Sequence, residues 1–137
     1  MVYEVKSPIL GFENVQNVEL ENIDETFVRL RAMDNTFEMT LINPYVLLKE
    51  YNFTIPTALQ ILLELEEGRD KVEVYCPLVL QNPVQDSEVG FSSPFVFNPA
   101  KGYVAQVSLD IREYPELGIT KPIKAFLPQE LLESLGK

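Results

Sequence analysis

Apolar and polar residues alternate along much of this chain, which is the pattern of half-buried strands rather than of helices. Four alternating segments fall in the first third of the sequence, at residues 2–6, 15–20, 27–33 and 37–42. In the third segment, Val28, Leu30 and Ala32 would face a core while Arg29 and Arg31 face solvent. We expect the four segments to be neighbours in an antiparallel meander.

The β pattern continues in the second half of the chain. Residues 72–81 alternate again, and Pro77 lacks the N–H that a ladder needs, which predicts an edge position or a bulge. Residues 90–97 and 103–109 predict two further strands, joined by a turn at residues 98–102. About seven short strands with one or two short helices predict a mainly β fold, a compact barrel-like single domain.

One helix is expected after Pro56, where Thr57 and Gln60 have the spacing of a capping box and Pro56 could pack on Ile61. Gly68 would end this helix. Most of its side chains are leucine and isoleucine, so we expect the helix to lie deep in the body of the protein. There it would plug one end of the sheet.

A second short helix is expected near the end of the chain, with Pro128 as its first residue and Gly136 at its stop. Two turns of helix are marginally stable alone in water, so this helix should dock on its own domain or on a partner. The expected organisation is one domain over residues 1–137, in which residues 117–137 form a C-terminal tail that contains the helix.

The formal net charge of −10 predicts the kind of partner. Such a field repels nucleic-acid phosphates and anionic lipids and attracts basic proteins, so we expect neither direct nucleic-acid binding nor membrane binding. No apolar run approaches the roughly 20 residues of a membrane span, and the opening residues do not resemble an export signal. With Cys76 as the one cysteine, these features predict a cytoplasmic protein that is a monomer when free.

The composition also argues against catalysis. The chain contains no histidine, which excludes Ser-His-Asp and Cys-His devices and histidine-based zinc sites. One cysteine cannot build a thiolate metal cage, and none of the glycines has the spacing of a phosphate-binding loop. Paired carboxylates and an oxygen-ligand calcium site stay open, but adjacent acidic residues are more simply interpreted as solvated surface. We therefore expect a protein that is not an enzyme and has no cofactor or metal.

Residues 41–56 are unusually apolar and aromatic for a connection between a strand and a helix. Tyr45, Tyr51 and Phe53 are each interpreted most simply as core aromatics. The alternative is that part of the segment forms an exposed apolar anchor with an acidic rim at Glu50, which is the composition of an interface centre.

Several short motifs follow one another in a characteristic order: Gly11-Phe12-Glu13, Ile42-Asn43-Pro44-Tyr45, Tyr51-x-Phe53-x-Ile55-Pro56, Ser93-Pro94-Phe95-Val96-Phe97-Asn98, Ala105-Gln106-Val107 and Tyr114-Pro115. In this order and at these distances they resemble the flagellar assembly factor FliW family, from about residue 5 to residue 116. Two places differ from the family pattern: Ser93 to Asn98 stands for the commoner Ala-Pro-Ile-Val-Ile-Asn, and Glu88-Val89-Gly90 for a usual Thr-x-Asn.

The resemblance implies a compact β-barrel-like fold and a partner switch. FliW proteins bind CsrA, a small RNA-binding repressor of translation, and thereby release flagellin messenger RNA, while free flagellin competes for FliW. The alternative is a chaperone for flagellin or another export substrate that does not touch CsrA. The apolar and acidic character of these segments and the family motif together predict the following contact residues: Asn43, Pro44, Tyr45, Val46, Glu50, Tyr51, Asn52, Phe53, Asn82, Pro83 and Val84.

Overall fold

The computed structural model describes residues 1–66, 71–117 and 122–125. The strands in these ranges are β1 (Val2–Val5), β2 (Asn17–Asn22), β3 (Phe27–Ala32), β4 (Glu38–Ile42), β5 (Glu73–Val79), β6 (Glu88–Val89), β7 (Phe95–Asn98) and β8 (Tyr103–Gln106). The helical elements are α1 (Thr57–Leu62) and the 3-10 turns η1 (Pro44–Val46), η2 (Val84–Asp86), η3 (Pro115–Leu117) and η4 (Ile123–Ala125).

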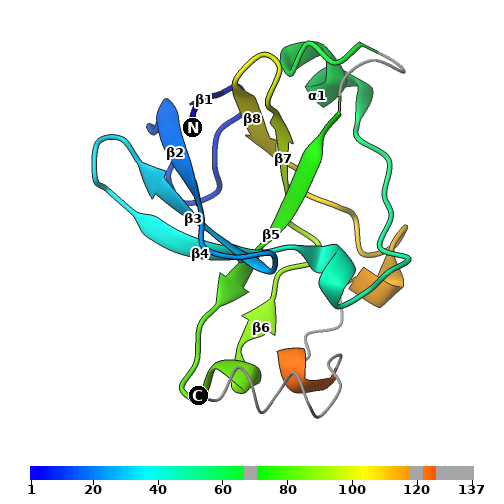
Figure 1. Ribbon diagram of the computed structural model, residues 1–137. Coiled ribbons are helices and arrows are strands. Elements are labelled where there is room, and N and C mark those ends of the chain that lie inside the picture. Colours follow the sequence, from blue (N-terminus) through cyan, green and yellow to red (C-terminus); the bar gives the residue numbers. More distant parts are fainter. Residues whose placement is uncertain (67–70, 118–121, 126–137) are drawn as a thin grey trace.

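The strands close into a barrel. Their order is β4-β3-β2-β1-β8-β7-β5, and the pairing of β5 with β4 completes the circle (Figure 1). The first four strands form the predicted antiparallel meander. The pairing of β1 with β8 is parallel and joins the beginning of the barrel to its end. The short strand β6 pairs with β5 outside the circle. The predicted mainly β, barrel-like fold is therefore confirmed.

The barrel interior holds the apolar positions that the alternation predicted. Val28, Leu30 and Ala32 of β3 are buried there together with residues of the other strands. Phe97 is fully buried, and the rings of Tyr3 and Tyr75 meet it edge-on, with centroids 5.0 Å and 5.8 Å from its own. Edge-to-face contacts of this kind add to the burial of each ring. Phe97 therefore lies at the centre of this core.

The outer face of β2, β3 and β4 carries charges. Arg29 contacts Glu38 at 2.9 Å and Arg31 contacts Glu19 at 2.5 Å, in a ladder across the three strands. The prediction that both arginines point away from the core is confirmed. Exposed ion pairs contribute little stability each, so this face is held mainly by the apolar side chains behind it.

The outer face of β4, β5, β7 and β8 is covered instead of exposed. Val96 and Ala105 point outward and pack with Leu63, which follows α1. On β4 and β5, Ile42 and Cys76 point outward and are covered by the segment that follows β4 and by the end of the described chain. Strand β7 is therefore buried on both faces, which explains its apolar run Phe95-Val96-Phe97.

Strand β5 changes partners along its length. Residues 73–75 pair with β7, whereas residues 78–79 pair with β6. Pro77 lies between these two ladders and is opposite Leu41 of β4. Because the strand has neighbours on both sides here, Pro77 is not at an edge. Pro77 has no N–H, but it lies where the ladder with β7 ends and the ladder with β6 begins, so no ladder hydrogen bond is lost there.

The helix after Pro56 differs from the prediction in three respects. Pro56 occupies the N-cap position without a side-chain hydrogen bond, and the Gln60 amide donates to the carbonyl of Ile55, so the predicted capping box is wrong. The helix ends at Leu62, before a left-handed Glu64 (φ 52°), and Gly68 lies outside the described residues. The predicted deep burial is also wrong, because Ile61 is 70% exposed and α1 contains no buried residue.

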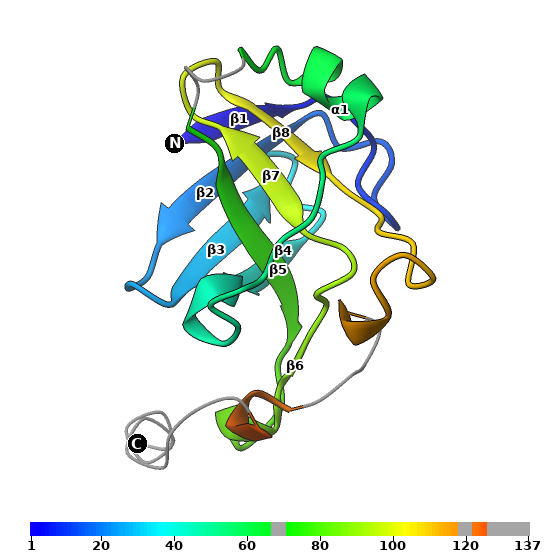
Figure 2. The same ribbon diagram turned by 90° about the vertical axis from the view of Figure 1, so that its right-hand side faces the viewer.

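α1 also lies in a different place from the one predicted. Leu59 and Leu63 pack on outward residues of β7 and β8, so the helix covers the side of the barrel near one end instead of plugging that end (Figure 2). Leu63 is the residue that anchors this segment, since it is fully buried while Leu62 is 42% exposed. The Asn98 side chain secures it further by donating to the Leu63 carbonyl at 2.8 Å.

Part of the predicted tail packs on the body of the protein. Leu117 and Ile123 are buried in the cluster that covers β4 and β5. Ile123 also donates its backbone N–H to Ser87, and Lys124 contacts Asp86 at 2.7 Å. The helix predicted between Pro128 and Gly136 lies outside the described residues.

Candidate partner-binding surface

The turn after β4 presents two apolar side chains on a well-supported backbone. Asn43 caps η1: its side-chain oxygen accepts the backbone N–H of Tyr45 at 3.0 Å, and its own N–H donates to Thr26 at 2.8 Å. The backbone N–H of Leu47 donates to the Pro44 carbonyl at 3.1 Å. Tyr45 and Val46 are 42% and 38% exposed. An apolar pair is thus held in solvent by a fixed turn.

Tyr51 anchors this turn to the barrel. Its ring is only 5% exposed, and its hydroxyl donates to the carbonyl of Phe91 at 2.7 Å. The Cys76 thiol donates to the same hydroxyl at 3.6 Å. The rings of Tyr45 and Phe53 lie 5.8 Å and 5.6 Å from that of Tyr51. Tyr51 is thus a core residue that supports an exposed neighbour.

The structure divides the predicted contact residues into exposed and buried ones. Tyr45, Val46, Glu50 and Asn52 are exposed, Asn43 and Phe53 are half-buried, and Pro44 and Tyr51 are buried. We call the exposed set, Tyr45, Val46, Glu50 and Asn52, the η1 surface. The interpretation of these rings as core is confirmed for Tyr51 and is wrong for Tyr45, which lies on the surface.

The second predicted contact segment lies away from the η1 surface. Asn82 and Pro83 are exposed, are joined by a cis peptide bond, and precede η2, which begins at Val84. Both views show η2 beyond the end of β5, whereas η1 lies beside the middle of that strand (Figures 1 and 2). The alternation pattern gave no sign of the apolar side chains beside this segment, Val79 and Leu80, which are 58% and 55% exposed.

Burial governs the ionisation of the groups beneath the η1 surface. It raises the pKa of the Cys76 thiol from 9.0 to about 12, although the hydrogen bond with Tyr51 acts in the opposite direction. Burial likewise raises the pKa of Tyr51, followed by the interaction with Cys76. A buried thiol of this kind stays protonated at neutral pH and behaves as a small apolar side chain.

The raised pKa of Cys76 predicts a loss of stability in alkali. Between pH 9 and about 12 the unfolded chain releases the thiol proton while the folded chain retains it, so the free energy of unfolding should fall as the pH rises. Urea unfolding of the native protein and of Cys76→Ala across this window measures the effect. We expect a shallower fall in the variant at the lower end of the window, below the ordinary tyrosine value of 10.0. Equal slopes for both proteins would contradict this assignment.

Two further properties concern the described part of the chain. No group of three or more potential ligand residues there is arranged to hold a metal ion. No helix in residues 1–66, 71–117 and 122–125 combines the length and the hydropathy needed to cross a bilayer.

The fold and the η1 surface define a class of protein, a small β-barrel whose outer face is covered on one side and which carries an apolar turn beside an acidic rim. A crystal structure of the flagellar assembly factor FliW has the same fold, with a TM-score of 0.74 and 20% sequence identity over 88% of this chain and 82% of that one.

Sequence comparison identifies the family. The profile described as FliW protein matches residues 1–123. Flagellar assembly factor FliW 2 of Helicobacter hepaticus is 52% identical over the full length of both chains. Flagellar assembly factor FliW of Helicobacter pylori is 47% identical over 95% of this chain and 97% of that one, and FliW 1 of Wolinella succinogenes is 42% identical over 94% and 100%. The chain belongs to the FliW family of flagellar assembly factors, as the motifs predicted.

Proposed function

We propose that this protein acts in flagellar assembly by binding the translational regulator CsrA, antagonising it, and exchanging it for flagellin. The observation that carries the proposal is membership of the FliW family, together with an exposed apolar turn on a chain of net charge −10. The protein would perform this function in the cytoplasm, where the messenger RNA and newly made flagellin are found.

The surface chemistry supports a basic partner. CsrA must carry positive charge to hold RNA, so an acidic protein is attracted to it and repels the RNA that it binds. Val46 and Tyr45 would supply the desolvated centre of the contact, and Glu50 would supply a charged rim. Apolar contact would hold the complex together, while charge would set the association rate and exclude RNA.

The η1 surface is well suited to this role because contacts within the protein already hold its conformation. The capped turn and the buried Tyr51 ring fix Tyr45 before any partner arrives. A surface ordered in advance loses less conformational entropy on binding than a mobile loop does. We propose that the η1 surface is the first contact site, and that Asn82, Pro83 and Val84 belong to a separate one.

The proposal is tested by mixing the purified protein with CsrA and with flagellin, separately and together, and following complexes by size-exclusion chromatography. We expect a CsrA complex whose affinity falls by about tenfold between about 50 and 300 mM NaCl, because salt screens the attraction. Added flagellin should release CsrA. The protein alone should elute as a monomer.

Each result decides something. A flagellin complex without any CsrA complex would favour a chaperone and contradict the antagonist function. A CsrA complex that resists salt would contradict the proposed role of charge, and the absence of both complexes would overturn the proposal as a whole.

A further inference from the structure

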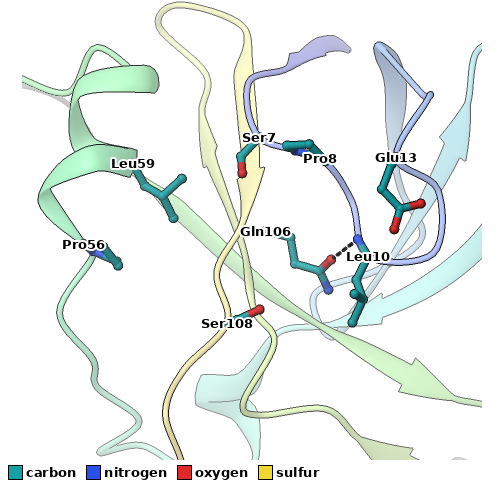
Figure 3. Close-up of a pocket in the computed structure, with 8 residues that line it drawn as sticks. All are labelled: Ser7, Pro8, Leu10, Glu13, Pro56, Leu59, Gln106 and Ser108. Carbon is teal, nitrogen blue, oxygen red and sulfur yellow. Dashed lines mark hydrogen bonds between the residues drawn. The ribbon is translucent and has the colours of Figure 1, made fainter.

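A groove of about 380 Å³ lies between the loop after β1, the start of α1 and the end of β8 (Figure 3). One wall is formed by Pro8 and Leu10, the other by Pro56 and Leu59, and the floor by Gln106 and Ser108. The groove is separate from the η1 surface, none of whose residues line it.

The wall at Leu10 is fixed although it is exposed. The side chain of Gln106 accepts the backbone N–H of Leu10 at 3.0 Å and donates to the carbonyl of Ser93 at 3.3 Å. This bridge ties the loop after β1 to the floor of the groove. The Leu10 side chain is nevertheless 73% exposed, so a large apolar group is held out in solvent on an anchored backbone. Exposed apolar groups held in this way mark interaction sites when they line a concavity.

The floor of the groove offers an unpaired strand edge. The ladder between β1 and β8 ends with the bond from Lys6 N–H to the Val104 carbonyl, after which the first strand leaves. Val107 and Leu109 donate to Pro94 and Ser92 on the opposite side. Because successive residues of an extended chain point their backbone groups to alternate sides, Ser108 faces the place that β1 has left. Among the described residues, its N–H has no hydrogen-bond partner.

The charge of the groove is negative. Glu13 lines it, is exposed, and uses one carboxylate oxygen to accept the N–H of Gly11 at 3.1 Å. Its other oxygen has no partner in the part of the chain that the structure describes. Among the residues that the structure describes, no basic one lines the groove. A lysine or arginine of a ligand would therefore be attracted to the Glu13 end.

We propose that this groove binds an extended segment of a basic partner protein, which adds as a strand beside residues 106–108. Ser108 supplies a backbone donor, Leu10 and Leu59 contact apolar side chains of the segment, and Glu13 pairs with a basic one. Pro8 and Pro56 in the walls have no backbone N–H to donate. The backbone hydrogen bonds to the bound segment must therefore form at residues 106–108. A second copy of this chain is a poor occupant because it carries the same net charge of −10.

The test uses the full-length protein and a capped octapeptide that alternates threonine and valine and ends in two lysines. Binding is followed by amide chemical shifts and by hydrogen exchange of the Ser108 N–H, which is open in the free protein. We expect the peptide to shift the Ser108 resonance and to slow its exchange by about tenfold or more. Replacing both lysines by glutamates should abolish binding, and N-methylating alternate peptide residues should weaken it by about tenfold.

Matched variants separate the backbone donor from the side chain. Ser108→Pro removes the N–H without removing any hydrogen bond within residues 1–66, 71–117 and 122–125, whereas Ser108→Ala keeps the N–H and removes only the hydroxyl. We expect about tenfold weaker binding for Ser108→Pro and unchanged binding for Ser108→Ala. Glu13→Gln, which can still accept from Gly11, should remove the preference for lysine.

The outcomes are decisive even if Ser108→Pro is too unstable to measure, because the N-methylated peptides probe the same bonds with the native protein. Equal binding of methylated and unmethylated peptides, or of the lysine and glutamate peptides, would overturn the proposal, as would the absence of any change at Ser108. Because the synthetic peptide is neither CsrA nor flagellin, this test is independent of the proposed function.

Discussion

Replacing Phe97 by alanine is expected to lower the free energy of unfolding by about 3 to 5 kcal/mol, the cost of removing a large ring from a packed core. Phe97 is fully buried in the barrel, where the rings of Tyr3 and Tyr75 meet its edge or face at 5.0 Å and 5.8 Å. It also joins β7 to β5 and β8, opposite Glu73 and Val104. The cavity cannot close easily because three strands hold its walls.

Urea unfolding, followed by circular dichroism at neutral pH, measures this loss. The control is Ile111→Ala, which removes an apolar side chain that is 55% exposed and should change the free energy of unfolding by less than about 0.5 kcal/mol. Since small domains are stable by only about 5 to 15 kcal/mol, a loss of this size removes a large part of the stability. A loss of less than about 1 kcal/mol would show that the barrel core tolerates rearrangement at this ring.

The inward and outward faces of the strands could be predicted because alternation is a local property. In β3 the valine, leucine and alanine positions point inward, and Arg29 and Arg31 pair with Glu38 and Glu19 outside. The strand pairs that close the barrel could not be predicted in the same way. One of these pairs joins Val5 to Val104 in parallel, and the two residues are far apart in the sequence. Neither segment contains a local pattern that identifies the other as its partner.

The burial of the helix was mispredicted because a run of leucines does not indicate which of their side chains will be buried. The chain turns left-handed at Glu64, so α1 lasts six residues and only Leu63, beyond its end, becomes fully buried. Ile61 points into solvent instead. A helix of this length presents too little surface to bury leucines on several sides at once.

In the candidate sites, too, features set by neighbouring residues could be predicted, whereas features set by residues distant in the sequence could not. Asn43, Pro44, Tyr45 and Val46 could be placed among the predicted contact residues because they stand next to one another in an apolar segment that carries a family motif. Tyr51 was placed in the same set although its ring was interpreted most simply as core, and it is held in the core by Phe91 and Cys76, which are distant in the sequence. The groove at Ser108 could not be predicted at all, since Leu10 and Gln106, which fix it, are 96 residues apart.

Val46→Asp combined with Glu50→Lys is expected to weaken CsrA binding by at least about 100-fold if the η1 surface is the first contact site. The aspartate would place a charge at the apolar centre of the contact, where it must be desolvated without a partner. The lysine would reverse the rim charge that faces a basic protein. Both side chains are exposed, and neither forms the bonds that hold η1, so the fold should survive.

The matched control is Val2→Asp combined with Glu4→Lys on the outer face of β1, where both side chains are also exposed. The two pairs change the net charge equally, so a general electrostatic effect would weaken CsrA binding alike in both. Isothermal titration calorimetry at one salt concentration measures the difference, and urea unfolding confirms that both variants fold. Native affinity in the η1 variant would exclude this surface as the CsrA site, whereas an equal loss in both variants would assign binding to overall charge. A selective loss requires a local contact at the η1 surface, because the two pairs change the net charge of the protein equally.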